Sequence, residues 1–187
     1  ANILFYVEIM SIIELNRYFQ VDTTTFQSKG IVIFDFNDAK SEEFIENYII
    51  PFRQSYISDE DLDYEVNNGI NIRKDAIENK LPTLPNLKSG EFGEILIFFL
   101  ASIFICPDAN IAPVKWQWKE HRDAPCHLTD IMFMKCTNDT MPQPTDYVCS
   151  IEVKAAATPI GPKSKKSKMN DAIKDAYKDK ESRIGKM

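Results

Sequence analysis

The chain lacks the features that mark membrane, secreted and disulfide-rich proteins. Its longest uncharged stretch, residues 95–107, is shorter than the roughly 20 residues that a membrane-spanning helix requires. The N-terminus has no basic region followed by a small-residue cleavage site. The four cysteines form no C-x-x-C pair, and three have apolar neighbours, so we expect buried thiols rather than disulfides. These absences predict a cytoplasmic protein without a membrane partner.

Positive charge is scarce except near the C-terminus. The chain has 187 residues, a net charge of −6 and 44% hydrophobic residues, which is enough apolar material for a globular core. Residues 161–187 carry nine Lys or Arg and four Asp or Glu, so this segment stands at +5 and residues 1–160 at −11. One basic segment on an acidic body is typical of a local anion-binding site or of a solvated tail. Charge alone favours the tail.

The N-terminal half predicts α/β structure. Residues 30–36 form a β-branched and aromatic run after a glycine, which predicts a buried strand. Ser41 followed by two acids predicts the N-cap of a helix that ends at Pro51. Residues 53–88 are polar and contain turn and breaker residues, so we expect a mixed connecting region with a domain boundary near its end. The period of residues 3–19 fits a strand or a helix equally well.

The C-terminal half predicts the order helix, three strands, helix. Residues 89–105 should form a buried helix that opens with two acids at its positive end and stops before Pro107. Segments rich in Val, Ile, Phe, Trp and Tyr then predict a three-stranded meander: residues 112–118, 128–135 and 147–155. After a lysine-rich run, Asn170 is expected to cap a last helix.

A glutamate and a lysine stand two residues apart on the last predicted strand. Residues i and i+2 of a strand face the same way, so Glu152 and Lys154 should lie side by side, about 7 Å apart at Cα. Asp130 belongs to the preceding strand, and paired strands lie about 4.8 Å apart, so Asp130 and Glu152 can share one hard cation such as Mg²⁺. A carboxylate-bound Mg²⁺ activates water, and a lysine stabilises charge on a phosphate. The pattern therefore favours phosphodiester hydrolysis.

A two-residue pattern of this kind also arises by chance. Glu78-Asn79-Lys80 has the same spacing, but it comes after a helix-like stretch and is followed closely by a proline, so we place it on the surface. The structural alternative for Glu152 and Lys154 is an exposed ion pair on a half-solvated strand, which contributes little free energy.

Other residues have both a functional and a structural interpretation. Two histidines and two cysteines could suggest zinc, but no pair has ligand spacing, and buried thiols are the simpler interpretation: His121, Cys126, His127 and Cys136. Trp116 and Trp118 could stack on bases, although such a face more often packs under a helix. The lysine run could clamp phosphates, because it follows the strand that bears Lys154: Lys163, Lys165, Lys166 and Lys168.

Three blocks of sequence together resemble a nuclease family. Gly90-Glu91-Phe92-Gly93-Glu94-Ile95-Leu96, His127-Leu128-Thr129-Asp130 and Ile151-Glu152-Val153-Lys154 follow the order of the PD-(D/E)xK nuclease superfamily. More narrowly, residues 87–187 resemble the HamA family, the nuclease subunits of the Hachiman anti-phage defence system. Thr129 stands where the superfamily motif has proline. The superfamily core normally adds a strand after the last helix, so we expect this core to be truncated at its C-terminus.

The resemblance implies a fold and an activity. The fold would be a restriction-endonuclease-like α/β core at residues 87–187, with the three-stranded meander inside a mixed sheet, preceded by an N-terminal α/β extension at residues 1–86. The activity would be that of a Mg²⁺-dependent deoxyribonuclease, with Mn²⁺ as a substitute, which serves as the effector of a defence complex with a helicase subunit. The alternative is a catalytically silent module of the same fold that docks the helicase.

The resemblance also implies roles for individual residues. Asp130 and Glu152 would hold the metal, and Glu94 would be the helix acid that completes the site, with Glu91 less favoured. Lys154 would position the attacking water and stabilise the transition state. The acidic body of the chain suits docking on a protein more than on a duplex.

Overall fold

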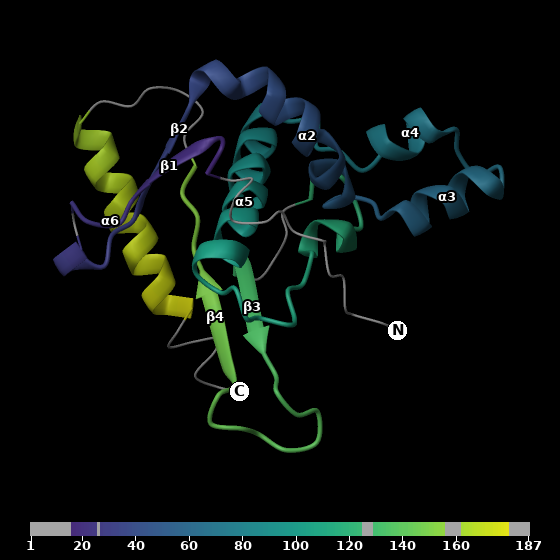
Figure 1. Cartoon of the computed structure of the whole chain (residues 1–187). Helices are drawn as coiled ribbons and strands as arrows, with labels where there is room; N and C mark the ends of the chain where they lie inside the picture. Colours follow the sequence, from purple (N-terminus) through teal and green to yellow (C-terminus); the bar gives the residue numbers. More distant parts are fainter. Residues whose placement is uncertain (1–15, 26, 125–128, 156–161, 180–187) are drawn as a thin grey trace.

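The computed structural model describes residues 16–25, 27–124, 129–155 and 162–179 (Figure 1). In chain order its helices and strands are β1 (Phe19–Asp22), β2 (Ile33–Phe36), α2 (Ser41–Gln54), α3 (Asp59–Asn67), α4 (Arg73–Glu78), α5 (Pro85–Phe104), β3 (Ile131–Lys135), β4 (Tyr147–Ile151) and α6 (Pro162–Asp179). Three 3₁₀ helices are η1 (Gln27–Lys29), η2 (Asp38–Lys40) and η3 (Lys115–Trp118). The ambiguous segment at residues 3–19 lies mostly outside the described residues, although Phe19 opens β1.

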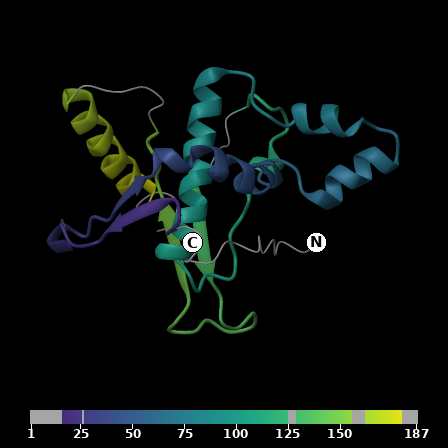
Figure 2. The same cartoon turned by 45° about the horizontal axis from the view of Figure 1, so that its top comes forward.

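The long helix α5 lies at the centre of the molecule. Figures 1 and 2 show the β3–β4 hairpin beside it, α6 on one side of the hairpin, and α3 and α4 projecting on the opposite side. Helices and strands therefore mix along the chain, and the prediction of an α/β protein is confirmed at this level.

The strands of the described residues form two separate antiparallel pairs. β1 pairs with β2 from Phe19↔Phe36 to Asp22↔Ile33, and β3 pairs with β4 from Ile131↔Ile151 to Lys135↔Tyr147. The predicted first strand of the meander, residues 112–118, is wrong, because residues 115–118 wind into η3. Lys115 and Trp116 are neighbours and are both buried, whereas a strand would send adjacent side chains to opposite faces.

The first predicted strand and helix are displaced from their predicted limits. Residues 31–33 are exposed, because β2 belongs to a two-stranded sheet and only one of its faces packs against the core, so the prediction of a buried strand is wrong. Ser41 is the first residue of α2 rather than its cap, since η2 leads directly into the helix. α2 also continues through Pro51 to Gln54, and the amide of Ser55 closes this last turn on the carbonyl of Pro51.

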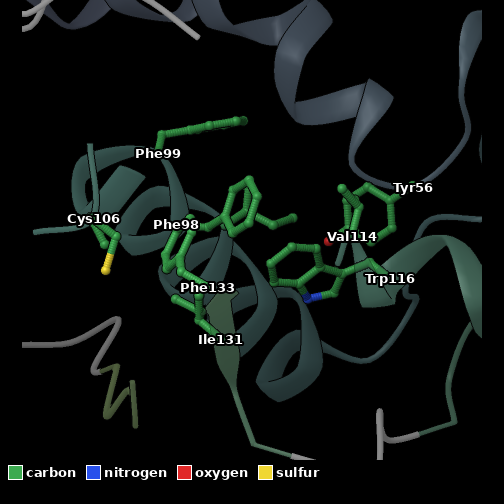
Figure 3. Close-up of a cluster of buried hydrophobic side chains, with 10 residues drawn as sticks. Tyr56, Phe98, Phe99, Cys106, Val114, Trp116, Ile131 and Phe133 are labelled. Atoms are coloured by element: carbon green, nitrogen blue, oxygen red, sulfur yellow. The ribbon is translucent and has the colours of Figure 1, made fainter. Parts of the chain in front are cut away.

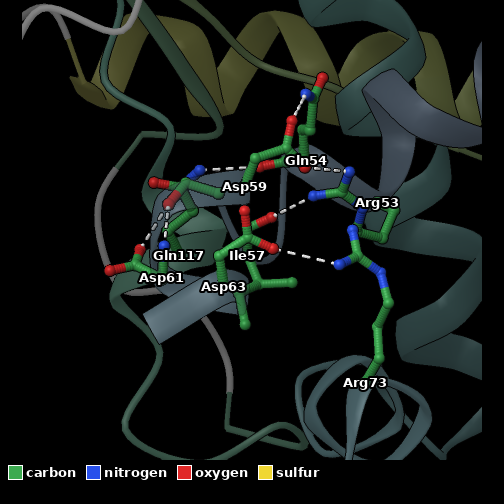
Figure 4. A network of polar contacts seen from close by, with 9 residues as sticks. Arg53, Gln54, Ile57, Asp59, Asp61, Asp63, Arg73 and Gln117 are labelled. Carbon is green, nitrogen blue, oxygen red and sulfur yellow. Dashed lines mark hydrogen bonds and ion pairs between the residues drawn. The ribbon is translucent and has the colours of Figure 1, made fainter. Parts of the chain in front are cut away.

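The predicted connecting region at residues 53–88 is largely helical. Ser58 caps α3 by accepting a 3.0 Å hydrogen bond from the amide of Asp61, and Leu62 and Ala76 bury the contact between α3 and α4. Figure 4 shows how polar side chains join these helices: Arg53 and Gln54 of α2 bind Asp59 of α3, and Arg73 of α4 binds Asp63 of α3. The region forms a small helical unit because its few apolar residues fall on facing turns.

Two apolar clusters share α5. In the first, Phe98 stacks on Phe133 of β3 at 5.2 Å between ring centroids and meets Trp116 edge to face at 5.8 Å (Figure 3). In the second, α5 contributes Leu100 and Ile103 to a group that includes Phe44 of α2. Residues on both sides of the predicted boundary at residue 86 thus pack on one helix. The division into an extension and a core stays a prediction.

The last helix begins eight residues before the predicted cap at Asn170. α6 starts at Pro162, a favourable first position because the fixed φ of proline suits a helix and its missing N–H has no partner to lose. The lysine run is therefore helical. Within the part of the chain that the structure describes, no helix, α5 included, is long and apolar enough to cross a membrane.

Candidate active site

The two acids of the Gly90–Glu94 motif lie inside α5 rather than at its positive end. α5 begins at Pro85, and its first turn contains no acid, so the predicted stabilisation by the helix dipole is wrong. The helix starts earlier because Pro85 fits its first turn and Leu84 adopts an extended backbone before it. Glu91 and Glu94 instead project from the side of the helix toward other segments.

Gly93 brings this part of α5 against the chain that follows β4. A Cβ atom added at Gly93 would lie 2.7 Å from the Cβ of Ala155 and 4.0 Å from a methyl carbon of Val153. Real Cβ atoms do not approach this closely, so only glycine permits the contact. The same close approach brings the backbone of the Gly90–Glu94 motif against the end of the E-x-K motif.

Asp130 connects the start of β3 to the middle of the E-x-K motif. The residue precedes β3, and its Oδ2 accepts a 2.7 Å hydrogen bond from the backbone amide of Val153, which lies between Glu152 and Lys154. β4 ends at Ile151, so the prediction that a strand continues through residue 155 is wrong. The side chain of Asp130 thus satisfies the amide of Val153, which would otherwise need a backbone partner from an extended β3.

Glu152 and Lys154 contact each other beyond the end of β4. Lys154 Nζ lies 2.5 Å from Glu152 Oε1 and 2.9 Å from Asp175 Oδ2 of α6. The hydrogen bond with Glu152 is the main reason that the pKa of Lys154 lies above its usual value, and the contacts with Lys154 and Lys178 lower the pKa of Asp175. No sequence pattern pointed to Asp175, because its role depends on how α6 docks.

A buried lysine stands between the helix acid and Asp130. Lys115 Nζ lies 3.0 Å from Glu94 Oε2 and 3.9 Å from Asp130 Oδ1, and it donates to the carbonyl of Thr129 at 3.4 Å. Its ammonium group also lies 5.7 Å from the ring centroid of Trp116. Sequence reasoning missed Lys115, although a lysine inside the apolar run Val114-Lys115-Trp116 is a signal that its charge is paired.

Burial sets the protonation behaviour of the helix acid. The pKa of Glu94 is raised, chiefly because burial removes its carboxylate from water; Lys115 acts in the opposite direction and Asp130 adds to the rise. Trp116 Nε1 donates a 3.2 Å hydrogen bond to the same Glu94 Oε2 that meets Lys115. Two carboxylates from distant parts of the chain therefore share one ammonium in a partly dehydrated space.

The second acid of the motif has a different environment. Glu91 is buried, and its Oε1 lies 2.5 Å from Lys119 Nζ, which also donates to the carbonyl of Arg122. Glu91 Oε2 is buried and has no hydrogen-bond partner among the described residues. Glu91 thus anchors the segment after η3, whereas Glu94 faces Asp130.

The donor set suits a hard cation, but it is not a preformed three-acid site. Carboxylate oxygens are the ligands that Mg²⁺ prefers, and Glu94 and Asp130 converge on one cationic group. Over the described ranges, however, no group of three or more His, Cys, Asp or Glu side chains is arranged to hold a metal. Glu152 is paired with Lys154, whereas Glu94 and Asp130 are paired with Lys115.

The remaining candidates are distributed as follows. Cys126 and His127 lie outside the described residues, while Trp116 is buried in the core and Trp118 is 57% exposed, so the two indoles do not share a face. The control match ends α4, with Glu78 exposed as predicted. The lysine run lies in α6, and its side chains lie outside the described residues: Lys163, Lys165, Lys166 and Lys168.

These features define a mixed α/β protein whose carboxylates and lysines gather where α5, η3 and the β3–β4 hairpin meet. A family model described as HamA matches residues 11–186, and the chain belongs to the HamA family. This confirms the resemblance to the HamA family and makes the protein a component of Hachiman anti-phage defence. The match extends well beyond residues 87–187, into the N-terminal half. Neither the curated proteins nor the solved structures contain a significant match.

Proposed function

We propose that this HamA-family protein is a metal-dependent DNA nuclease of the PD-(D/E)xK superfamily, with a restriction-endonuclease-like core, that acts as the effector of its defence complex. One observation carries the proposal: Asp130 accepts a hydrogen bond from the backbone inside the E-x-K motif and shares the ammonium group of Lys115 with Glu94. Three sequence blocks that are far apart along the chain thus meet at one point. An incidental E-x-K match has no reason to gather the other two blocks.

The roles follow from the contacts. A bound Mg²⁺ would supply an activated water and Lewis-acid stabilisation. Glu94 and Asp130 would hold the ion, with Glu152 joining them after it turns from Lys154. Lys154 would meet a phosphate oxygen of DNA, because its side chain is more exposed than those of Lys115 and Lys119. The environment of Glu94 supports it over Glu91 as the helix acid, since Glu91 pairs with Lys119 instead.

Plasmid cleavage tests the proposal, with a matched control in the same chain. The purified protein, alone and with its helicase partner, is incubated with plasmid and Mg²⁺ or Mn²⁺, with and without EDTA. Glu152→Ala and Lys154→Ala should each lower the cleavage rate by a factor of about 100 or more, on the order of losing a transition-state contact. Glu78→Ala and Lys80→Ala remove the other E-x-K match and should cleave at the parental rate. Equal rates in all four variants contradict the assignment.

The competing proposal is a silent module that docks the helicase. It is favoured by the fact that lysines already neutralise the acids of the site, as in a cluster of structural ion pairs. This proposal predicts no cleavage with or without the helicase, and unchanged helicase binding when Glu152 and Lys154 are replaced. Helicase pull-down beside the plasmid assay separates the two proposals.

A further inference from the structure

We infer that Lys115 is an internal counter-ion that occupies the cation position between Glu94 and Asp130, so that a divalent metal must displace its ammonium group to bind. The inference rests on the proposed nuclease function, because it concerns the same acids. Only 8% of the Lys115 side chain is exposed, so its charge depends on Glu94 and Asp130 rather than on water.

The ammonium and a metal ion cannot occupy the site together in the observed geometry. Lys115 Nζ stands 3.0 Å from Glu94 Oε2 and 3.9 Å from Asp130 Oδ1, so it fills the space between the oxygens. A divalent ion that used both oxygens would need them at roughly 2.0–2.6 Å and would then lie against the ammonium group. Two like charges at such a separation repel strongly in a dehydrated site. The metal therefore competes with Lys115 rather than binding beside it.

The backbone of η3 is held in place, so the displacement falls on side chains. Gln117, two residues after Lys115, donates a 2.7 Å hydrogen bond to the carbonyl of Gln54 in α2, and both residues appear in Figure 4. Val114 and Trp116, the chain neighbours of Lys115, are both buried in the first core cluster. With this segment anchored, the flexible Lys115 stem must carry its ammonium away from the acids.

Trp116 is a natural reporter of this exchange. Its indole N–H donates to Glu94 Oε2, and its ring lies near the Lys115 ammonium, so metal binding changes both polar neighbours of the ring. Trp118 is the second tryptophan of the chain. Trp118→Phe therefore leaves Trp116 as the sole source of indole fluorescence.

The chain offers a matched control for the displaced lysine. Lys119 is also buried and also pairs with a glutamate of α5, but its partner is Glu91. Lys115→Met removes the competing charge from the proposed metal position, whereas Lys119→Met removes a similar charge from outside it. The two variants lose the same functional group and share the same replacement.

Calorimetric titration with Mn²⁺ tests whether Lys115 competes with the metal. We expect Lys115→Met to bind Mn²⁺ roughly 5- to 150-fold more tightly than the parent, the range typical of coupling between two interacting groups in a protein, while Lys119→Met binds as the parent does. Unchanged or weaker Mn²⁺ binding by a folded Lys115→Met protein overturns the inference and leaves the nuclease proposal intact. No Mn²⁺ binding by any of the three proteins overturns both.

If Lys115→Met does not fold, the fluorescence of Trp116 gives a second test of the displacement. In the Trp118→Phe protein, Mg²⁺ should shift the emission of Trp116 in a saturable way that EDTA reverses. The shift should vanish when Glu94→Gln and Asp130→Asn are added. A Trp116 spectrum that stays constant while calorimetry records Mg²⁺ binding overturns the displacement.

Discussion

Two glycines of α5 provide a sensitive test of how the site is assembled. Gly90 and Gly93 lie in the same helix, but a Cβ at Gly90 meets nothing within 4 Å, whereas a Cβ at Gly93 would lie 2.7 Å from the Cβ of Ala155. Replacing a helical glycine by alanine stabilises the helix by about 1 kcal/mol, because the unfolded chain loses conformational freedom. Gly90→Ala should therefore raise the free energy of unfolding by about that amount.

Gly93→Ala combines the same helical gain with a steric penalty. The nearest atom belongs to Ala155, whose side chain has no rotamer that would move it away, so the helix and the segment after β4 must separate. Overpacking of this kind costs roughly 1–3 kcal/mol, which leaves Gly93→Ala between neutral and about 2 kcal/mol less stable than the parent. Relative to Gly90→Ala, the difference should be at least about 1 kcal/mol.

The separation should also affect chemistry. Because Glu94 follows Gly93, a shift of α5 moves the helix acid away from Asp130, and small misplacements cost much of the rate in a positioned site. Urea unfolding measures the first effect, and plasmid cleavage by the folded variants measures the second. A Gly93→Ala protein as stable and as active as Gly90→Ala would refute the close approach of α5 to Ala155.

Two further predictions concern the C-terminal helix and the β3–β4 connection. Replacing the lysine run by glutamine, at Lys163, Lys165, Lys166 and Lys168, should weaken DNA binding. The slope of log K against log salt concentration, measured by fluorescence anisotropy across KCl concentrations, should become shallower by roughly 0.9 for each phosphate that is no longer neutralised. An unchanged slope contradicts phosphate binding by these residues. The amides of Gln143 and Thr137 lower the pKa of Asp146 below its ordinary 3.8, so its stabilisation is present above pH 3.8 and is lost as the pH falls through the folded value. In Asp146→Asn the free energy of unfolding, measured with urea, should fall less steeply at acid pH, whereas Asp139→Asn in the same connection should fall as the parent does. If both variants follow the same acid profile, Asp146 is not the source of the pH dependence.

The sequence was informative where local pattern and tertiary packing agree. The β3–β4 hairpin follows from two β-prone segments around a loop rich in turn residues, and α5 from a long apolar segment. For residues 112–118 the same local pattern gave a wrong prediction, because Val, Trp and alternating polar residues suit a strand. What decided their structure was the adjacent burial of Lys115 and Trp116, which depends on acids and aromatic rings from α5 and β3.

The helices of residues 53–88 were missed for another reason. Their apolar residues are few, and the polar composition resembles a loop, yet Ser58 followed by three acids is an N-cap signal that the sequence contained. α3 and α4 bury only a small cluster around Leu62 and Ala76. A short amphipathic pair of this kind has a weak hydrophobic period, so capping residues carry more information than periodicity.

The site shows the same division between local and long-range information. The E-x-K spacing and the acid at residue 130 can be recognised in the sequence, because chemistry fixes their residue types. Asp175 cannot be recognised in this way, because it joins the site only through the packing of α6. The apolar residues around Lys115 signal that its charge is paired, but which acids it pairs with depends on the packing of η3. A sequence motif identifies candidate reactive groups by their residue types. The side chains that neutralise those groups when no substrate is bound are set by tertiary packing.

The exposure of the three lysines suggests how these groups divide the work. Lys119 is 4% exposed and binds Glu91, Lys115 is 8% exposed and bridges Glu94 to Asp130, and Lys154 is 29% exposed between Glu152 and Asp175. Of these three, Lys154 is the one that a phosphate arriving from solvent can reach, a small cation that enters the site meets Lys115, and Lys119 stays inside. Graded access of this kind is what a site needs if metal and DNA must each displace a different internal partner.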